Sequence, residues 1–100
     1  RSYLWIDDAV RKIIRVMEGP NPGLINIGFQ GAISVREVVN ICVDYVGIRP
    51  RVVFNAQRPS GVLSRDCSNV KFRRLYGQLE TVDTAAGFHK MIDALSVASL

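Results

Sequence analysis

The stretch SVREVVNICVDYVG, from Ser34 to Gly47, carries the clearest structural signal in the sequence. Ser34 and Glu37 have the spacing of a capping box, in which the two side chains bond backbone N–H groups at the start of a helix. Apolar side chains recur at helical spacing along the stretch: Val35, Val38, Val39, Cys42, Tyr45 and Val46. Gly47 fits the left-handed position that commonly ends a helix. The stretch therefore predicts a helix with one buried face.

Upstream of this helix, the sequence predicts a second helix with a short strand on either side. Asp7 and Asp8 are suited to cap the helix, and the Gly19-to-Gly23 segment, which contains two prolines, stops it. The helix has apolar positions at helical spacing, which predicts one buried face: Val10, Ile13, Ile14 and Met17. Residues 3–6 and 24–27 are short runs of β-forming residues, which favour strands.

Downstream, the sequence predicts one more strand, a long loop and two helices. Residues 51–54 favour the strand, and residues 55–67, here called the basic loop, contain Pro59 and Gly61. A short helix over 69–76 follows, and Asp83 is suited to cap the last helix. The order is then β-α-β-α-β-α-α. Alternating strands and helices indicate an α/β fold with a small parallel or mixed sheet covered by helices.

The composition is that of one globular domain. The chain has 100 residues, of which 48% are hydrophobic and 22% are charged, so disordered and fibrous classes are excluded. No apolar run reaches the ~20 residues that cross a bilayer, so we expect no membrane association. Cys42 and Cys67 form neither a disulfide framework nor a zinc motif. We therefore expect reduced thiols, no metal and a cytoplasmic location.

The positive charge is concentrated in one quarter of the chain. The net charge is +4, but the segment from Arg49 to Arg74 holds seven basic side chains and one acidic side chain. Arg58 and Arg65 lie beside Pro59 and Gly61, which suits a phosphate clamp, because guanidinium groups match phosphate oxygens in pairs. A solvated loop is the open alternative, since exposed arginine is common. The modest total charge and sparse aromatics argue against nucleic-acid binding.

The chain carries no assembled catalytic group. His89 is the single histidine, and we expect it on the surface of the last helix. A glycine-rich phosphate loop, a Walker-type lysine and a Tyr-x-x-x-Lys pair are all missing from the sequence. Whether this chain alone is an enzyme therefore stays open.

Five segments resemble, in order and with matching gaps, the motifs of extended short-chain dehydrogenases/reductases of the nucleotide-sugar epimerase/dehydratase family. Arg1–Val10 resembles R-D-F-x-Y-V-x-D-x-A, and residues 26–37 resemble N-I-G-x-G-x-x-x-S-I-R-E-L. Residues 59–65 resemble P-x-G-V-x-x-R, residues 68–77 resemble D-x-S-K-x-x-x-L-L-G, and residues 87–88 fall where the family has E-E-G-L. Departures such as Gln78, where tryptophan is common, leave the branch and the sugar open.

The resemblance implies that residues 1–100 are one C-terminal substrate-binding segment. The N-terminal Rossmann domain, with NAD or NADP and the catalytic tyrosine and lysine, would lie outside this chain, and the first residue, Arg1 rather than Met, agrees with a piece of a longer protein. The parent would be an NAD(P)-dependent epimerase, dehydratase or reductase acting on a GDP- or UDP-sugar, for example a GDP-fucose-synthase-like enzyme. The segment itself would bind no cofactor.

The resemblance also implies site residues and partners. Arg1 and Arg65 would converge on the diphosphate or the nucleoside, Arg58 is a looser candidate, and Val53 would lie near the base. The partners would be the nucleotide-sugar, the Rossmann half and further copies in a homo-oligomer. The alternative is a non-catalytic module of the same fold that binds a nucleotide-sugar or another protein.

The resemblance has a consequence for stability. Without the Rossmann half, apolar residues such as Ile13, Ile14 and Ile25 would be exposed. We therefore expect the segment to self-associate or to be only marginally folded.

Overall fold

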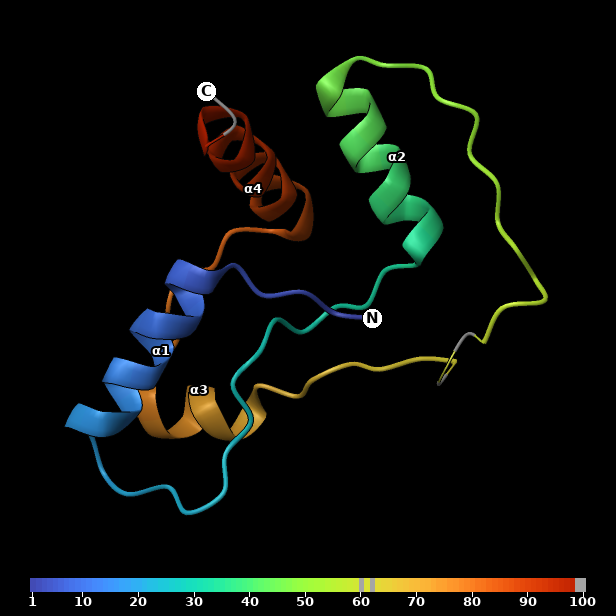
Figure 1. The fold of residues 1–100 in the computed structure, drawn as a ribbon. Coiled ribbons are helices and arrows are strands. Elements are labelled where there is room, and N and C mark those ends of the chain that lie inside the picture. The colour runs from blue at the N-terminus through green and yellow to red at the C-terminus, as the bar shows by residue number, and fades with distance from the viewer. Residues whose placement is uncertain (60, 62, 99–100) are drawn as a thin grey trace.

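The computed structural model describes residues 1–59, 61 and 63–98, and within these ranges the chain forms four helices and no strand (Figure 1). The helices are α1 (Ile6–Glu18), α2 (Val35–Val46), α3 (Val70–Tyr76) and α4 (Thr84–Ala98). The predicted α/β fold with a parallel or mixed sheet is therefore wrong. The helices were predicted in the right order and near the right bounds.

The three predicted strands lack neighbours to pair with. Residues 3–5 lead directly into α1, and residues 24–27 and 51–54 are irregular. A strand forms only when a second segment satisfies its backbone groups, and parallel strands also need both faces covered. A β-like pairing does occur between Arg1 and Ile33, where each backbone nitrogen donates to the other carbonyl oxygen at 2.9 Å. This single pair does not extend into a ladder.

The ends of α2 and α4 confirm the predicted caps. The Ser34 Oγ accepts a hydrogen bond from the Glu37 backbone N–H at 3.1 Å. Gly47 ends α2 in the left-handed conformation, with φ 80° and ψ 21°. The Asp83 Oδ1 accepts a hydrogen bond from the Ala86 N–H at 2.8 Å. These contacts span at most four residues, so the sequence alone is enough to predict them.

The start of α1 differs from the prediction. Trp5 occupies the N-cap position and makes no side-chain capping bond, while Asp7 and Asp8 lie inside the first turn. They still complement the helix dipole there. Other groups use the oxygens of Asp8: Oδ2 accepts from the Val82 N–H at 3.0 Å, and Oδ1 pairs with Arg11 of the same helix.

Helices α2 and α4 lie side by side (Figure 1). The ring of Tyr45 on α2 stacks on His89 of α4, with centroids 4.0 Å apart. The Tyr45 hydroxyl donates to both oxygens of Asp93 at 2.8 and 2.9 Å, and this hydrogen bond raises the pKa of Tyr45. His89, expected on the surface, is thus half-buried between the two helices.

The buried core is small and lies where α1 meets α3. Phe72 and Tyr76 are 2% and 6% exposed, and the charged residues Asp8 and Lys12 of α1 are 3% and 5% exposed. The Lys12 ammonium lies 5.5 Å from the centroid of the Phe72 ring. The Tyr76 hydroxyl donates to the Pro20 carbonyl at 2.6 Å. Helix α1 therefore turns a charged face toward α3.

The apolar face of α1 points outward. Its members are between 46% and 78% exposed: Ile6, Val10, Ile13, Ile14 and Met17. The burial that helical spacing predicts for this face is therefore wrong within this chain. Ile13 and Ile14 are exposed, as expected without a Rossmann half, whereas Ile25 is half-buried. The chain exposes 7719 Å², against roughly 5,700 Å² for a compact monomer of 11.1 kDa. Its radius of gyration is 16.3 Å, against about 13 Å for a compact chain of this length.

The Gly28 carbonyl joins α1 to the start of α3. Its oxygen accepts hydrogen bonds from Lys12 Nζ and from Asn69 Nδ2, both at 2.9 Å. Gly28 itself is buried against Cys67. A Cβ added at Gly28 would lie 2.6 Å from the Cys67 Sγ and 2.9 Å from its Cβ. A side chain at this position would thus push the two segments apart.

We expect the 100-residue chain to self-associate through the apolar face of α1, because an exposed face of this kind is a contact surface. Replacing Ile13 and Met17 together with glutamate should shift the mass measured by light scattering toward the monomer. Leu63→Glu is the matched control, since Leu63 is fully exposed but lies in the basic loop. A wild-type chain that stays a compact monomer at all concentrations would contradict this expectation.

Gly28→Ala should lower the free energy of unfolding by about 1–3 kcal/mol, the usual cost of overpacking a tight contact. Urea denaturation measures the change. In a Cys67→Ala background the cost should shrink but not vanish, because the Cβ at 2.9 Å remains. In a Cys67→Gly background it should disappear. Equal costs in all three backgrounds would mean that Cys67 does not restrict Gly28.

Candidate functional site

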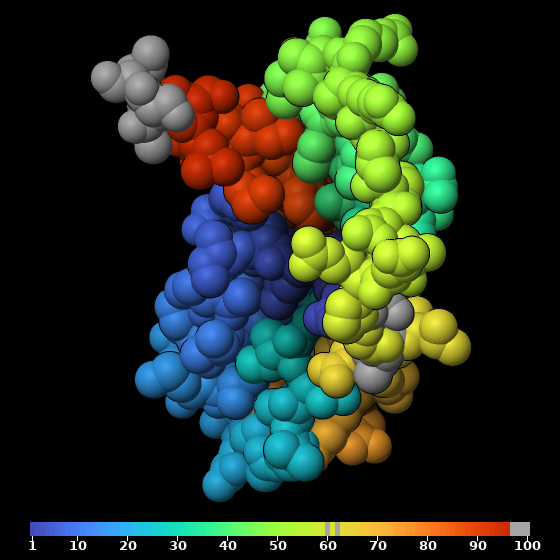
Figure 2. All heavy atoms as spheres, turned by 45° about the vertical axis from the view of Figure 1, so that its right-hand side comes forward, coloured from blue at the N-terminus to red at the C-terminus, as the bar shows by residue number. Residues whose placement is uncertain are grey.

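Arg1 reaches the basic loop. Its backbone is anchored by the pairing with Ile33. Its guanidinium Nη2 lies 3.7 Å from the position that a Cβ on Gly61 would occupy. Figure 2 shows the chain after α2 running over the surface toward the first residues of the protein. The structure thus brings the first residue beside the loop that carries Arg58 and Arg65. Ser60 and Val62, which belong to the motif in this loop, lie outside the described residues.

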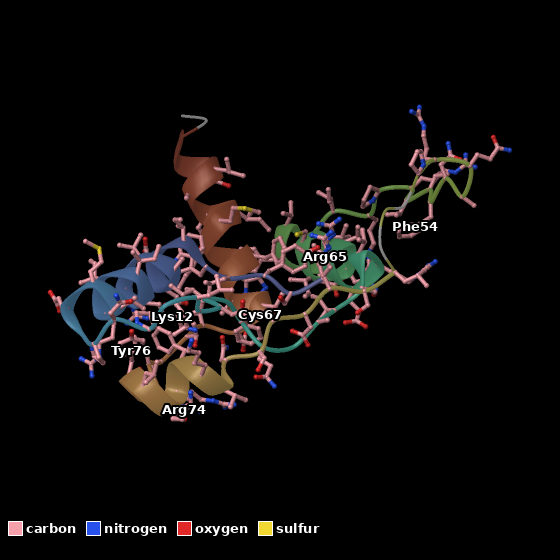
Figure 3. The ribbon with its side chains drawn as sticks, turned by 90° about the horizontal axis from the view of Figure 1, so that it is seen from below. Lys12, Phe54, Arg65, Cys67, Arg74 and Tyr76 are labelled. Atoms are coloured by element: carbon pink, nitrogen blue, oxygen red, sulfur yellow. The ribbon has the colours of Figure 1, made fainter. Side chains whose placement is uncertain are left out.

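The other predicted site residues are spread along the exposed chain between α2 and α3. Arg65, Arg58 and Val53 are all exposed, and Val53 is 72% exposed. Figure 3 shows Arg65 near α2, while Phe54 lies out on the projecting part of the chain. Arg58 closes a turn there, since its N–H donates to the Asn55 carbonyl at 3.2 Å. The structure therefore does not gather all four residues into one cleft.

The projecting segment touches α2 through one ring. The guanidinium carbon of Arg36 lies 4.4 Å from the centroid of Phe54. A cation above an aromatic face is attracted to it, most strongly where water is excluded. Because Phe54 is 46% exposed, the contact is a modest restraint on the position of Val53.

Asp66 holds the far end of the basic loop. Its Oδ1 accepts hydrogen bonds from the Gly31 N–H at 3.0 Å and from the Cys67 N–H at 2.7 Å. These two bonds lower the pKa of Asp66 because they favour the carboxylate. Gly31 is close in sequence to Ile33, which pairs with Arg1. The same short segment thus anchors both Arg1 and the residue that follows Arg65.

Among the residues that the structure describes, no ion pair joins an arginine of the site to an acidic side chain. The ion pair found among the described residues is Arg11–Asp8, far from the basic loop in sequence. Within residues 1–59, 61 and 63–98, neither a hydrogen bond nor an ion pair joins any two of Arg1, Val53, Arg58 and Arg65. The guanidinium groups are therefore available to an anion from solution.

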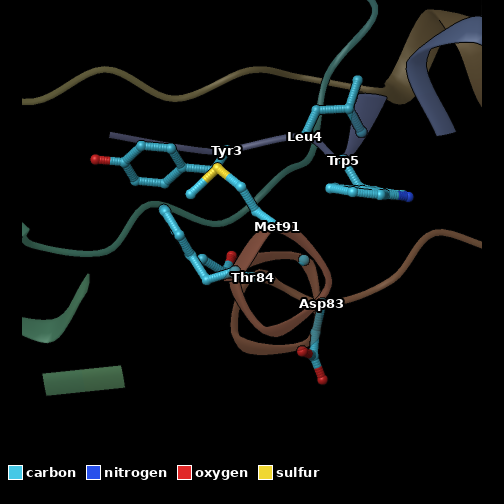
Figure 4. Close-up of a pocket in the computed structure, with 8 residues that line it drawn as sticks. Tyr3, Leu4, Trp5, Asp83, Thr84 and Met91 are labelled. Atoms are coloured by element: carbon cyan, nitrogen blue, oxygen red, sulfur yellow. The ribbon is translucent and has the colours of Figure 1, made fainter. Parts of the chain in front are cut away.

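An apolar pocket of about 120 Å³ lies between the first residues and α4. Figure 4 shows Tyr3, Leu4 and Trp5 on one side of it, and Asp83, Thr84 and Met91 on the other. The Tyr3 and Phe88 rings meet edge to face with centroids 5.1 Å apart. Tyr3 and Trp5 are both half-buried in this packing.

The sequence analysis missed the charged interior of the protein. The sequence predicts Asp8 as a cap, and Lys12 lies off the apolar stripe of α1. The structure buries both against α3 and the segment before α4. Helical periodicity shows which residues share a face, but the polar face of α1 is the one that packs. We find no signal in the sequence that would have shown this.

No family model, curated protein or solved structure matches the chain. In the part of the chain that the structure describes, no group of three or more histidine, cysteine, aspartate or glutamate side chains is placed to hold a metal ion. Nor does that part include a helix with the length and apolar character needed to cross a membrane.

Asp66→Asn should reduce the stability of the protein near neutral pH and make stability less sensitive to acid. The folded state lowers the pKa of Asp66 below its ordinary value of 3.8. Its stabilising contribution is therefore present above pH 3.8 and is lost as the pH falls through the lowered pKa. Denaturation curves between pH 2 and 7 should show the difference from wild type shrinking in acid.

Asp44→Asn is the control for this measurement, because Asp44 is an exposed residue of α2. It removes the same charge without touching the basic loop. If the two variants show the same dependence on pH, the hydrogen bonds to Gly31 and Cys67 do not stabilise the Asp66 carboxylate.

Proposed function

We propose that this chain is the C-terminal, nucleotide-sugar-binding part of an NAD(P)-dependent nucleotide-sugar epimerase, dehydratase or reductase. The five-segment resemblance names the class of ligand. The observation that carries the proposal is the Arg1 guanidinium beside Gly61. This contact brings Arg1 to the basic loop. Arg65 lies in the same loop, and the resemblance assigns both arginines to one substrate.

The chemistry of the pair suits a diphosphate. A guanidinium offers a planar fork of donors that matches two phosphate oxygens, and a nucleotide-sugar carries about two negative charges on its diphosphate. Gly61 has a φ of 72°, a conformation that favours glycine and leaves room for a phosphate to approach the backbone. Arg1 and Arg65 are the primary contacts in this proposal. Arg58 is a looser candidate from the same loop, and Val53 rests on the resemblance alone.

The bound nucleotide would orient the sugar for reaction. Interactions with the diphosphate are remote from the reacting carbon, and their binding energy serves to position it. The dinucleotide and the catalytic tyrosine and lysine belong to a second, Rossmann-type unit in this proposal, which supplies the hydride chemistry. The exposed apolar face of α1 is the surface we expect that unit to cover.

The proposed class of enzyme also suggests a cellular compartment and an oligomeric state. Cys42 and Cys67 are free thiols, which suits a reducing compartment. We place the parent enzyme in the cytoplasm and expect it to form a homo-oligomer.

Arg65→Ala should weaken binding of a UDP- or GDP-sugar by about 1.5–3 kcal/mol, the range for a hydrogen bond to a charged group. Arg1→Ala should have a similar effect. Isothermal titration calorimetry measures both, with the chain alone and with the parent enzyme.

Arg74→Ala is the matched control, because it removes the same charge from α3, away from Arg65 (Figure 3). It should leave the affinity near that of wild type. An equal loss in the Arg65 and Arg74 variants would show only a general attraction to anions. Unchanged affinity in Arg65→Ala would contradict the role assigned to Arg65.

A further inference from the structure

A second cavity, separate from Arg1 and Arg65, lies between α1, α3 and the segment before α4. Its volume is about 160 Å³, and because one water occupies about 30 Å³ of liquid, it has room for a group of several non-hydrogen atoms. Its lining is mostly polar and holds two cationic side chains and no carboxylate. The lining residues that matter here are Lys12, Gln30, Asn69, Phe72, Arg73 and Thr81.

Lys12 brings an incompletely satisfied ammonium to the wall of this cavity. The residue is 5% exposed, and an ammonium has three donors. The Gly28 carbonyl, at 2.9 Å, is the one hydrogen-bond acceptor that the described residues offer it. Burial lowers the pKa of Lys12, although the nearby Asp8 and Cys67 oppose the shift. A buried cation in this state is stabilised by an anion.

Asp8 favours the charged form of Lys12 through space but does not hydrogen-bond it, because other donors use its oxygens. Arg11 pairs with Oδ1, and the Val82 N–H donates to Oδ2 at 3.0 Å. The second cation of the lining, Arg73, comes from α3. The cavity thus has an excess of positive charge on its own walls.

Asn69 contributes an acceptor that needs a hydrogen-bond donor, in contrast to the two cations. Its Nδ2 donates to the Gly28 carbonyl at 2.9 Å, but its Oδ1 is buried with no hydrogen-bond partner. Buried acceptors are nearly always paired in folded proteins. A ligand that satisfies the whole site therefore brings anionic oxygens for Lys12 and Arg73, together with a hydrogen-bond donor, such as a hydroxyl, for Asn69.

We propose that this cavity binds a protonated phosphoryl group, either inorganic phosphate or the phosphate of a small monoester. Lys12 and Arg73 hold the anionic oxygens, and the Asn69 Oδ1 accepts a hydrogen bond from the P–OH. This site is independent of the diphosphate site proposed for the basic loop, since none of its lining residues belongs to that loop.

The hydroxyl requirement separates phosphate from sulfate. Both are tetrahedral anions of similar size, but sulfate carries no proton near pH 7. We expect inorganic phosphate to bind at least tenfold more tightly than sulfate, measured by ¹H–¹⁵N chemical-shift changes at Asn69 and Arg73. Equal affinities would overturn the assignment of Asn69. The measurement is made in an Arg65→Ala background, which removes the loop arginine assigned to the diphosphate. A failure of this proposal can then be distinguished from a failure of the proposed function.

Neighbouring arginines on α3 provide the test of position. Arg73 lines the cavity and Arg74 does not, while both are exposed enough for substitution to leave the fold intact. Arg73→Gln should weaken phosphate binding at least fivefold, and Arg74→Gln should leave it unchanged. Equal effects of the two variants would overturn the site.

Lys12→Met tests the buried ammonium while keeping its length against Phe72. We expect at least a tenfold loss of phosphate affinity, with the helical content checked by circular dichroism. Wild-type affinity in a folded Lys12→Met chain would overturn the proposal. If that variant does not fold, the Arg73 and Arg74 pair decides. Methyl phosphate in place of inorganic phosphate then shows whether the natural ligand is the free ion or a monoester.

Discussion

The carbonyl oxygen of Gly28 is the point on which the structure depends. Lys12 of α1 and Asn69 at the start of α3 both donate to it. One acceptor in the loop after α1 therefore connects the two helices. Leaving a buried ammonium without hydrogen bonds is costly, so this contact keeps the charged face of α1 turned inward. The close contact of Gly28 with Cys67 adds a steric condition, because no larger residue fits there.

The inward charge of α1 explains the outward apolar face. A helix that packs its polar side against α3 must present the opposite side to solvent, and here that side carries isoleucine, valine and methionine. Burial of apolar surface is the main favourable contribution to folding. The large exposed area of this chain therefore includes apolar surface that the described residues do not bury, although its burial would stabilise the fold. A covering partner would bury this surface, and in the function that we propose this partner is the Rossmann-type unit.

The two anion sites that we propose differ in environment. Arg1 and Arg65 lie in an exposed region, where water and salt weaken each contact, so a diphosphate must engage several groups together to bind well. Lys12 is itself buried, and a buried charge interacts more strongly than an exposed one. We therefore expect the loop to depend on the geometry of a large ligand, and the cavity to select a small group by charge and hydrogen bonding.

The sequence was sufficient for most of the features that depend on near neighbours, although not for the start of α1, where Asp7 and Asp8 lie inside the first turn. The Ser34 and Asp83 caps, the end of α2 at Gly47 and the order of the helices all follow from contacts within one helical turn. Tertiary structure alone decided that the β-forming runs stay unpaired, which face of α1 is buried, and that Arg1 meets Gly61 while Val53 lies apart. These outcomes depend on segments far apart in the chain. Local propensity carries no information about which distant segment is present to pair or pack.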